Sequence, residues 1–329
     1  MSFENVIQKI AETDIFARSQ NGEFQAGVFI GRPFYLDYDR AHILVADAWK
    51  HRAKGVPQGC FLLAYYDNEP NIAEALLLRV LRPAKLPTDN DVIASMVEYY
   101  KDNLRTSGQN NQLDTFTRYA FSFSGLECRI LGTFYRDSNG NLRFGADVEN
   151  FYSAHNYQVY KPGKAVLELI VNFRENSVTG QTQDIKIGRV RYSSSRRFQL
   201  QEDDVPVYVR PQDFLGKRTA LFGMTRTGKS NTVKKIIQAT VTMSKRAPLV
   251  LEKSTNMSPE EVLDPFTDQG LPKFPVGQII FDINGEYANP NLQDEGTAIF
   301  DLYSTETIRY SVLEKDGFKV MKVNFYNDI

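Results

Sequence analysis

One stretch of the sequence constrains this chain more than any other. Residues 223–230 read GMTRTGKS and satisfy the phosphate-loop pattern G-x-x-x-x-G-K-[ST] at every fixed position. A short apolar run at 219–222 precedes the loop, and apolar residues recur at helical spacing after it. A strand, a glycine-containing loop and a helix, in that order, form the context in which this pattern binds phosphate. The sequence therefore predicts a nucleotide-binding α/β unit.

Each fixed position of the loop has a chemical reason. Gly223 and Gly228 let the backbone turn so that successive N–H groups point at phosphate oxygens. Lys229 brings a positive charge to the β- and γ-phosphates, and Ser230 offers a hydroxyl to Mg²⁺. The cofactors expected are therefore ATP and Mg²⁺. The residues expected to bind them are Gly223, Thr225, Arg226, Thr227, Gly228, Lys229, Ser230 and Asn231.

A second motif follows another apolar run. Residues 278–281 are expected to form a strand, and the chain continues as DINGEY over 282–287. A carboxylate at the end of a strand beside the loop strand lies near the γ-phosphate in this architecture. Asp282 is expected to reach the Mg²⁺ shell and Glu286 to polarise the attacking water, which makes Lys229, Asp282 and Glu286 the candidate catalytic residues. The alternative is that 282–285 is only a strand-ending turn.

The first 204 residues have a different pattern, in which short strand-like runs alternate with Pro, Gly, Asn and Asp. We expect domains at 1–204 and 205–329, the first a β-barrel with a helix inserted at about 88–104. A helix is also expected over 3–11, and a hairpin turn at Asn139-Gly140. Further strands are expected at 119–123, 165–173 and 187–192 in this domain, and at 320–325 in the second domain. The alternating aromatic residues Tyr119, Phe121 and Phe123 are expected to fill the barrel interior.

The composition is that of an ordinary globular protein. The sequence has 39 Lys and Arg against 40 Asp and Glu, so its net charge does not indicate a nucleic-acid partner. Cys60 and Cys128 are far apart, and each lies in an apolar run, which predicts buried free thiols. No signal peptide and no run of 18 apolar residues is seen. We therefore expect a soluble, cytoplasmic protein without a membrane partner.

The two motifs together resemble the HerA family of hexameric DNA-translocating ATPases, relatives of FtsK. The resemblance rests on KRTALFG at 217–223, on FDINGEY at 281–287, and on the β-rich region before them. It implies a barrel-like N-terminal domain followed by an α/β P-loop core of the RecA type. The family's Walker B pair and arginine finger would lie beyond Ile329, which implies that this sequence ends inside the ATPase domain.

The resemblance also implies roles and partners. It assigns hydrolysis to Glu286 and a helper role to a basic residue at Lys217 or Arg218. It implies a homo-oligomeric ring, most simply a hexamer, that moves double-stranded DNA. The ring would serve an effector such as a nuclease or a sirtuin-like enzyme, in antiviral defence or DNA end processing. One departure is Arg226, a long cation where the family has a small residue.

Two alternatives remain open from the sequence. The first is a scaffold ring that nucleotide binding organises, with little turnover. The second is a GTPase, because residues 282–285 also satisfy the D-x-x-G pattern of that class. No N-K-x-D element for guanine selection appears before Ile329, and Glu286 stands where such GTPases usually have Gln.

Overall fold

The chain divides into two compact units. The computed structural model describes residues 13–69, 72–104, 115–174, 184–192, 204–224, 228–248, 265–268, 270–289 and 297–322. The first unit comprises Met1–Gly180 and Arg189–Val207, and the second comprises Gln181–Gly188 and Tyr208–Ile329. The helix expected at 3–11 lies outside the described residues.

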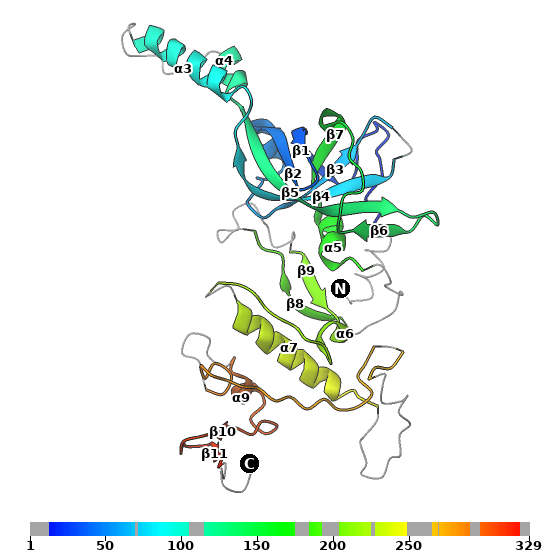
Figure 1. Ribbon diagram of the computed structural model, residues 1–329, viewed down its shortest axis with the longest axis vertical. Helices are drawn as coiled ribbons and strands as arrows, with labels where there is room; N and C mark the ends of the chain where they lie inside the picture. The colour runs from blue at the N-terminus through cyan, green and yellow to red at the C-terminus, as the bar shows by residue number, and fades with distance from the viewer. Residues whose placement is uncertain are drawn as a thin grey trace. The chain divides into compact units, whose positions relative to one another are not determined.

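The first unit is built on a closed antiparallel barrel (Figure 1). Its sheet has the strand order β2-β1-β7-β3-β4-β5-β6, and an additional pairing of β2 with β5 closes the ring, which leaves β6 as an extension of β5. This confirms the expected β-barrel. The strands are β1 (Gly27–Leu36), β2 (Arg40–Ala46), β3 (Phe61–Tyr66), β4 (Glu74–Ala84), β5 (Phe123–Arg136), β6 (Leu142–Gly145) and β7 (Tyr157–Pro162).

Alternate residues of a strand point to opposite faces of the sheet, so the barrel has two apolar clusters, one on each face. One cluster fills the interior and includes Ile43, Leu78 and Cys128. The other lies on the outside of the sheet and includes Tyr65 and Phe134, covered by helix α5 (Lys164–Asn172) and by the segment around Ile15. Cys60 and Cys128 are both buried free thiols, as expected.

A glycine lets β5 bend where β6 joins it. Gly132 has a φ of +147°, and a Cβ atom there would lie 2.1 Å from the carbonyl oxygen of Gly145. The register between β4 and β5 shifts between Leu77 and Leu78, which is the signature of a β-bulge. A residue without a side chain is therefore required at this point of the barrel.

The hairpin expected at Asn139-Gly140 joins β5 to β6. Gly140 has a φ of +80°, and the Asp137 carboxylate accepts hydrogen bonds from the backbone N–H groups of Asn139 and Asn141. Strands β5 and β6 then pair from Arg136 opposite Leu142. The turn chemistry of Asn-Gly thus fixes the register of the pair, as the sequence predicted.

Two expected strands are not formed. The strand predicted at 119–123 is wrong, because residues 119 and 120 lie in helix α4 (Thr115–Ala120) and residues 121 and 122 form a turn. The side chain of Tyr119 is 68% exposed, so it does not fill the barrel interior. The strand β5 begins only at Phe123, where pairing with β2 begins.

The strand predicted at 165–173 is wrong for a related reason. The residues form α5, in which the side chains of Val166, Leu167 and Leu169 are buried. Val166 and Leu169 belong to the apolar cluster on the outside of the barrel sheet. A short apolar run is compatible with either a buried strand or a buried helix, and only tertiary contacts decide between them.

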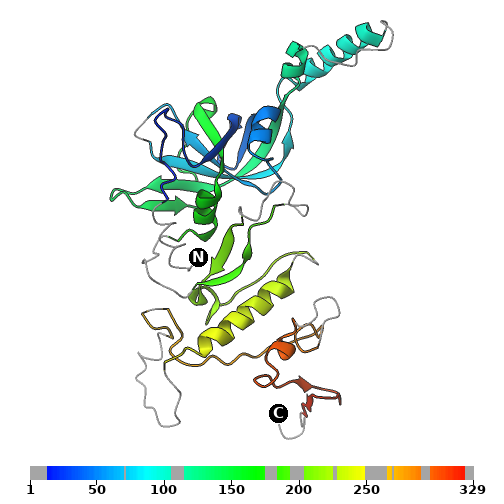
Figure 2. The same ribbon diagram turned by 180° about the vertical axis from the view of Figure 1, so that it is seen from behind.

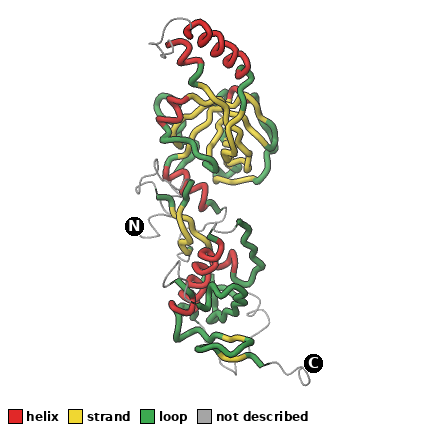
Figure 3. The backbone as a smooth tube through the Cα atoms, turned by 90° about the vertical axis from the view of Figure 1, so that its left-hand side faces the viewer, coloured by secondary structure: helices red, strands yellow, loops and turns green. Residues whose placement is uncertain are grey.

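The helical insertion extends from one end of the barrel, as all three views show (Figures 1, 2 and 3). It consists of α3 (Asp89–Leu104) followed by α4. The insertion leaves the sheet after β4 and returns at β5, which is the strand next to β4. Two short helical segments complete this unit, α2 (Asp47–Arg52) and η1 (Ala154–Asn156).

A two-stranded sheet is formed by residues on either side of 193–203, a stretch that lies outside the described residues. Strand β8 (Ile185–Arg189) pairs with β9 (Pro206–Val209), and the division between the units falls within this pair. The strand expected at 187–192 is thus shifted toward the N-terminus. Arg210 binds Asp184 at 3.0 Å beside the pair, and both side chains are mostly buried.

The second unit is organised by one long helix, α7 (Lys229–Ser244). The shorter elements are α6 (Pro211–Phe214), α9 (Ile299–Leu302), β10 (Tyr310–Ser311) and β11 (Lys319–Val320). Of the strand expected at 320–325, Val320 lies in β11, and residues 323–325 lie outside the described part. Within the described residues, no helix has the length and apolar character needed to cross a membrane.

The strands expected on either side of α7 are not formed. Residues 219–222 and 278–281 have no strand assignment, and Phe222 and Phe281 are 93% and 88% exposed. A strand needs at least one neighbouring strand to pair its backbone groups. Among the described residues of this unit no strand lies beside them, so the RecA-like core remains a prediction.

Candidate nucleotide site

The candidate site begins where the loop meets α7. Gly228 has a φ of +88° and precedes the first residue of the helix, Lys229. This left-handed conformation turns the chain sharply into the helix, which is the reason for glycine at this position. Residues 225–227, which include three of the expected nucleotide contacts, lie outside the described residues.

The side chain of Lys229 folds back over the loop. Its Nζ atom donates hydrogen bonds to the carbonyl oxygens of Gly223 and Met224, each at 2.6 Å. The ammonium group is therefore held at the mouth of the loop by oxygen acceptors. Phosphate oxygens are stronger acceptors than these carbonyl oxygens, so the ammonium group is suited to bind them instead.

The second motif meets the loop helix at Ser230. The hydroxyl group of Ser230 lies next to that of Tyr287 and interacts with it. Burial raises the pKa of Tyr287, and this interaction opposes the rise. Ser230, the expected Mg²⁺ ligand, and Tyr287, the last residue of the DINGEY motif, therefore lie together although 57 positions separate them in the sequence.

Asp282 holds a turn. Its Oδ1 atom accepts a hydrogen bond from the backbone N–H of Glu286 at 3.0 Å. Its Oδ2 atom accepts from Tyr287 at 2.9 Å and from Ala288 at 3.0 Å. Gly285, with a φ of +75°, allows the chain to fold back on the carboxylate. Both oxygens of Asp282 are thus engaged by the backbone that carries Glu286.

An arginine supports this turn from the far end of the sequence. The Nη1 atom of Arg309 donates to the carbonyl oxygen of Ala288 at 3.0 Å. Its guanidinium lies 3.5 Å from the ring centre of Phe300 and 4.3 Å from that of Phe318. Cation–π contacts of this kind fix an arginine in place. Sequence reasoning missed Arg309, because its partners are scattered along the chain.

The structure brings together part of the predicted site. Lys229 and Ser230 lie on the first turn of α7, and Ser230 contacts the turn that contains Asp282 and Glu286. Glu286 is half-buried next to Tyr287, whose pKa its charge helps to raise. Asn231, Lys217 and Arg218 are exposed, the last two shortly after α6.

The chain was compared with known proteins. Residues 185–251 match the family described as "Helicase HerA, central domain". The match runs from β8 through the phosphate loop to just beyond the end of α7. A search of curated proteins found no match to the chain. Within residues 185–251 the chain is therefore similar to the central domain of HerA-type P-loop ATPases.

Proposed function

We propose that this protein hydrolyses ATP and couples hydrolysis to the movement of double-stranded DNA as a subunit of a ring. One observation supports the proposal most. The phosphate loop of a HerA-type segment stands against the acidic DINGEY turn through the contact between Ser230 and Tyr287. A P-loop ATPase needs both parts within reach of one γ-phosphate.

The residues of the loop fit a nucleotide with its metal. The backbone around Gly228 and the N-terminus of α7 favour anionic phosphate, and Lys229 adds a mobile positive charge. Ser230 would turn its hydroxyl from Tyr287 toward Mg²⁺, which neutralises charge on the β- and γ-phosphates when bound. The contribution of this chain is thus to bind and orient the phosphates.

Hydrolysis also requires a base or an orienting group for water. We assign this role to Glu286, whose position is fixed by the hydrogen bond from its backbone N–H to Asp282. Asp282 then acts by holding the turn, and Arg309 supports the same turn from behind. Lys217, Arg218 and Arg226 are proposed as further contacts to the nucleotide or to a neighbouring subunit.

The partners in the proposal come from the family resemblance. A ring of six copies, a double-stranded DNA substrate and an effector enzyme such as a nuclease or a sirtuin-like protein are proposed on that basis. The same holds for a role in antiviral defence or DNA end processing. The HerA-type segment supports the motor class, and the experiment below tests the coupling to DNA.

Two variants test the assignment. Lys229→Ala should abolish ATP binding, whereas Glu286→Gln should bind ATP and lose about 100-fold or more in turnover. The measurements are nucleotide binding by fluorescence titration and steady-state ATP hydrolysis by the full-length protein, with and without double-stranded DNA. Thr242→Ala, on the exposed end of α7, is a control that should change neither quantity.

The outcomes separate the candidate functions. Turnover that rises with DNA and is lost in Glu286→Gln supports the motor. ATP binding without DNA-dependent turnover would instead favour the scaffold ring, which the full engagement of Asp282 by backbone N–H groups also supports. Guanine selectivity in a competition assay would overturn both in favour of a GTPase.

A further inference from the structure

The outer face of the barrel carries an unusual row of arginines. Arg129 on β5 lies directly opposite Arg40 on β2 and opposite Arg79 on β4. The residues next to them, Ala41, Cys128 and Val80, belong to the interior cluster, so alternation places the arginines outside. Arg82 on β4 joins them, opposite Glu127. These four residues, Arg40, Arg79, Arg82 and Arg129, are called the arginine face.

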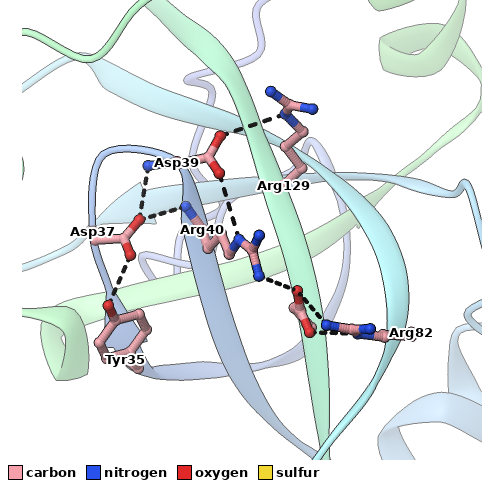
Figure 4. Close-up of polar contacts among 7 residues, drawn as sticks. Tyr35, Asp37, Asp39, Arg40, Arg82 and Arg129 are labelled. Atoms are coloured by element: carbon pink, nitrogen blue, oxygen red, sulfur yellow. Dashed lines mark hydrogen bonds and ion pairs between the residues drawn. The ribbon is translucent and has the colours of Figure 1, made fainter.

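Two carboxylates hold three of these four guanidinium groups, those of Arg40, Arg82 and Arg129 (Figure 4). Glu127 accepts from Nη1 of Arg40 at 3.0 Å and from Nε of Arg82 at 2.7 Å. Asp39 lies 3.4 Å from Nε of Arg40 and 3.5 Å from Nε of Arg129. The side chain of Glu127 is only 8% exposed, whereas those of Arg82 and Arg129 are 68% and 62% exposed.

The fold itself does not require such an arrangement. Like charges directly opposite each other on neighbouring strands are destabilising, and exposed ion pairs stabilise a protein little. Four arginines against Glu127 and Asp39 leave an excess of positive charge. Each guanidinium has five N–H donors in a planar fork, and the ion pairs use only some of them. The remaining donors are suited to a further anion.

We propose that the arginine face binds an acidic segment of a partner protein. The arginines project from adjacent strands, which are about 5 Å apart, and each guanidinium group can take one carboxylate of such a segment in a bidentate pair. Tyr35 borders the face, with its ring 5.1 Å from that of His42. Arginine and tyrosine are the residues that contribute most at protein interfaces. The proposal is independent of the nucleotide site.

The charge balance favours a protein over a nucleic acid. Nucleic acids gain affinity by contacting many phosphates at once, and carboxylates within the contact area oppose this. Asp39 and Glu127 lie among the arginines, and Asp37 is nearby, hydrogen-bonded to Tyr35 (Figure 4). A short segment with a few carboxylates matches this small, mixed surface better.

The test uses the full chain and two probes of equal net charge, a short glutamate-rich peptide and a single-stranded oligonucleotide. The wild type should bind the peptide more tightly. The double variant Arg79→Gln/Arg129→Gln, which leaves the pairs to Glu127 intact, should weaken peptide binding by about tenfold. Arg52→Gln/Arg118→Gln removes the same charge from exposed positions on α2 and α4 and should leave binding unchanged.

A third variant tests whether the arginines bind because Glu127 positions them or only because the face is positively charged. Glu127→Gln makes the face more positive but removes the ion pairs of Arg82 and Arg40 with Glu127, which leaves Arg40 with its ion pair to Asp39. If Glu127 positions the arginines, peptide binding weakens, with circular dichroism showing an intact fold. Stronger binding in Glu127→Gln, equal loss in the Arg52/Arg118 control, no peptide binding by the wild type, or preferential binding of the oligonucleotide would each overturn the proposal.

Discussion

A single nearly buried carboxylate illustrates what one residue contributes to this barrel. Hydrogen bonding to Arg82 lowers the pKa of Glu127, and the charges of Arg82 and Arg40 lower it further, while burial opposes the effect. A carboxyl group whose pKa is lowered on folding stabilises the protein above its unfolded pKa. That contribution is lost as the pH falls toward the folded pKa.

The barrel should therefore become less stable in acid partly through Glu127. We expect the free energy of unfolding to fall as the pH drops below about 4.3, the ordinary pKa of a glutamate. Glu127→Gln should have a shallower pH dependence in this range, because it has no carboxyl group to titrate. Urea titrations followed by the fluorescence of Trp49 measure this, and equal slopes in the two proteins would contradict it.

Residues of the candidate site were predictable only where they belong to a short motif of neighbouring positions in the sequence. Gly228, Lys229 and Ser230 follow from the loop pattern, and Glu286 from the acidic motif. Arg309 was not predictable, since its role comes from a carbonyl and two rings that the fold brings together. The arginine row was hidden for the same reason, because only strand register places its members opposite one another.

At the scale of elements, glycine controls how the strands of the barrel bend. A Cβ atom at Gly132 would meet a backbone oxygen, whereas at Gly140 it would meet nothing within 4 Å. Both residues have a positive φ. Gly132→Ala therefore suffers both backbone strain and a clash, and Gly140→Ala suffers strain alone.

The two alanine variants should differ in stability accordingly. Gly140→Ala should cost about 1 kcal/mol of unfolding free energy, the usual strain of a non-glycine residue at positive φ. Gly132→Ala should cost about 3 kcal/mol, because the backbone of the β5–β6 pair must also move. Chemical denaturation of both variants against the wild type is the measurement. A smaller loss in Gly132→Ala than in Gly140→Ala would show that the bulge relaxes easily.

The elements themselves were predictable to different degrees. Most barrel strands have alternation, turn residues or a hairpin signal that agree with one another, but β7, which pairs with β1 and β3, was not predicted from the sequence. The runs that became α4 and α5 were too short for periodicity to decide between helix and strand. The strands expected beside α7 failed because an apolar run forms a strand only where another strand is available to pair with it.

At the scale of the whole molecule, the division into two units predicts two unfolding steps. The first unit contains Trp49, which is the single tryptophan of the sequence, so its fluorescence reports on the barrel alone. The nucleotide site lies in the second unit. A ligand stabilises only the cooperative unit to which it binds.

Saturating Mg²⁺ and ATP should thus raise one midpoint of thermal unfolding and not the other. At 100 times the dissociation constant, the second unit should gain about 2.7 kcal/mol, seen in calorimetry as an upward shift of one transition. The transition followed by Trp49 fluorescence should stay in place. Lys229→Ala should show neither shift, and a shift of both transitions in the wild type would mean that the units unfold together.

The place where α3 and α4 are inserted has a practical consequence. The chain leaves the barrel at Ala84 and re-enters beside it, since Ala84 is paired with Gly125 of the adjacent strand. The two ends of the insertion are therefore held one strand spacing apart by the barrel, whatever lies between them. The connection between β4 and β5 is therefore a position where the helical pair can be exchanged for another module, in evolution or by engineering, without disturbing the two strands.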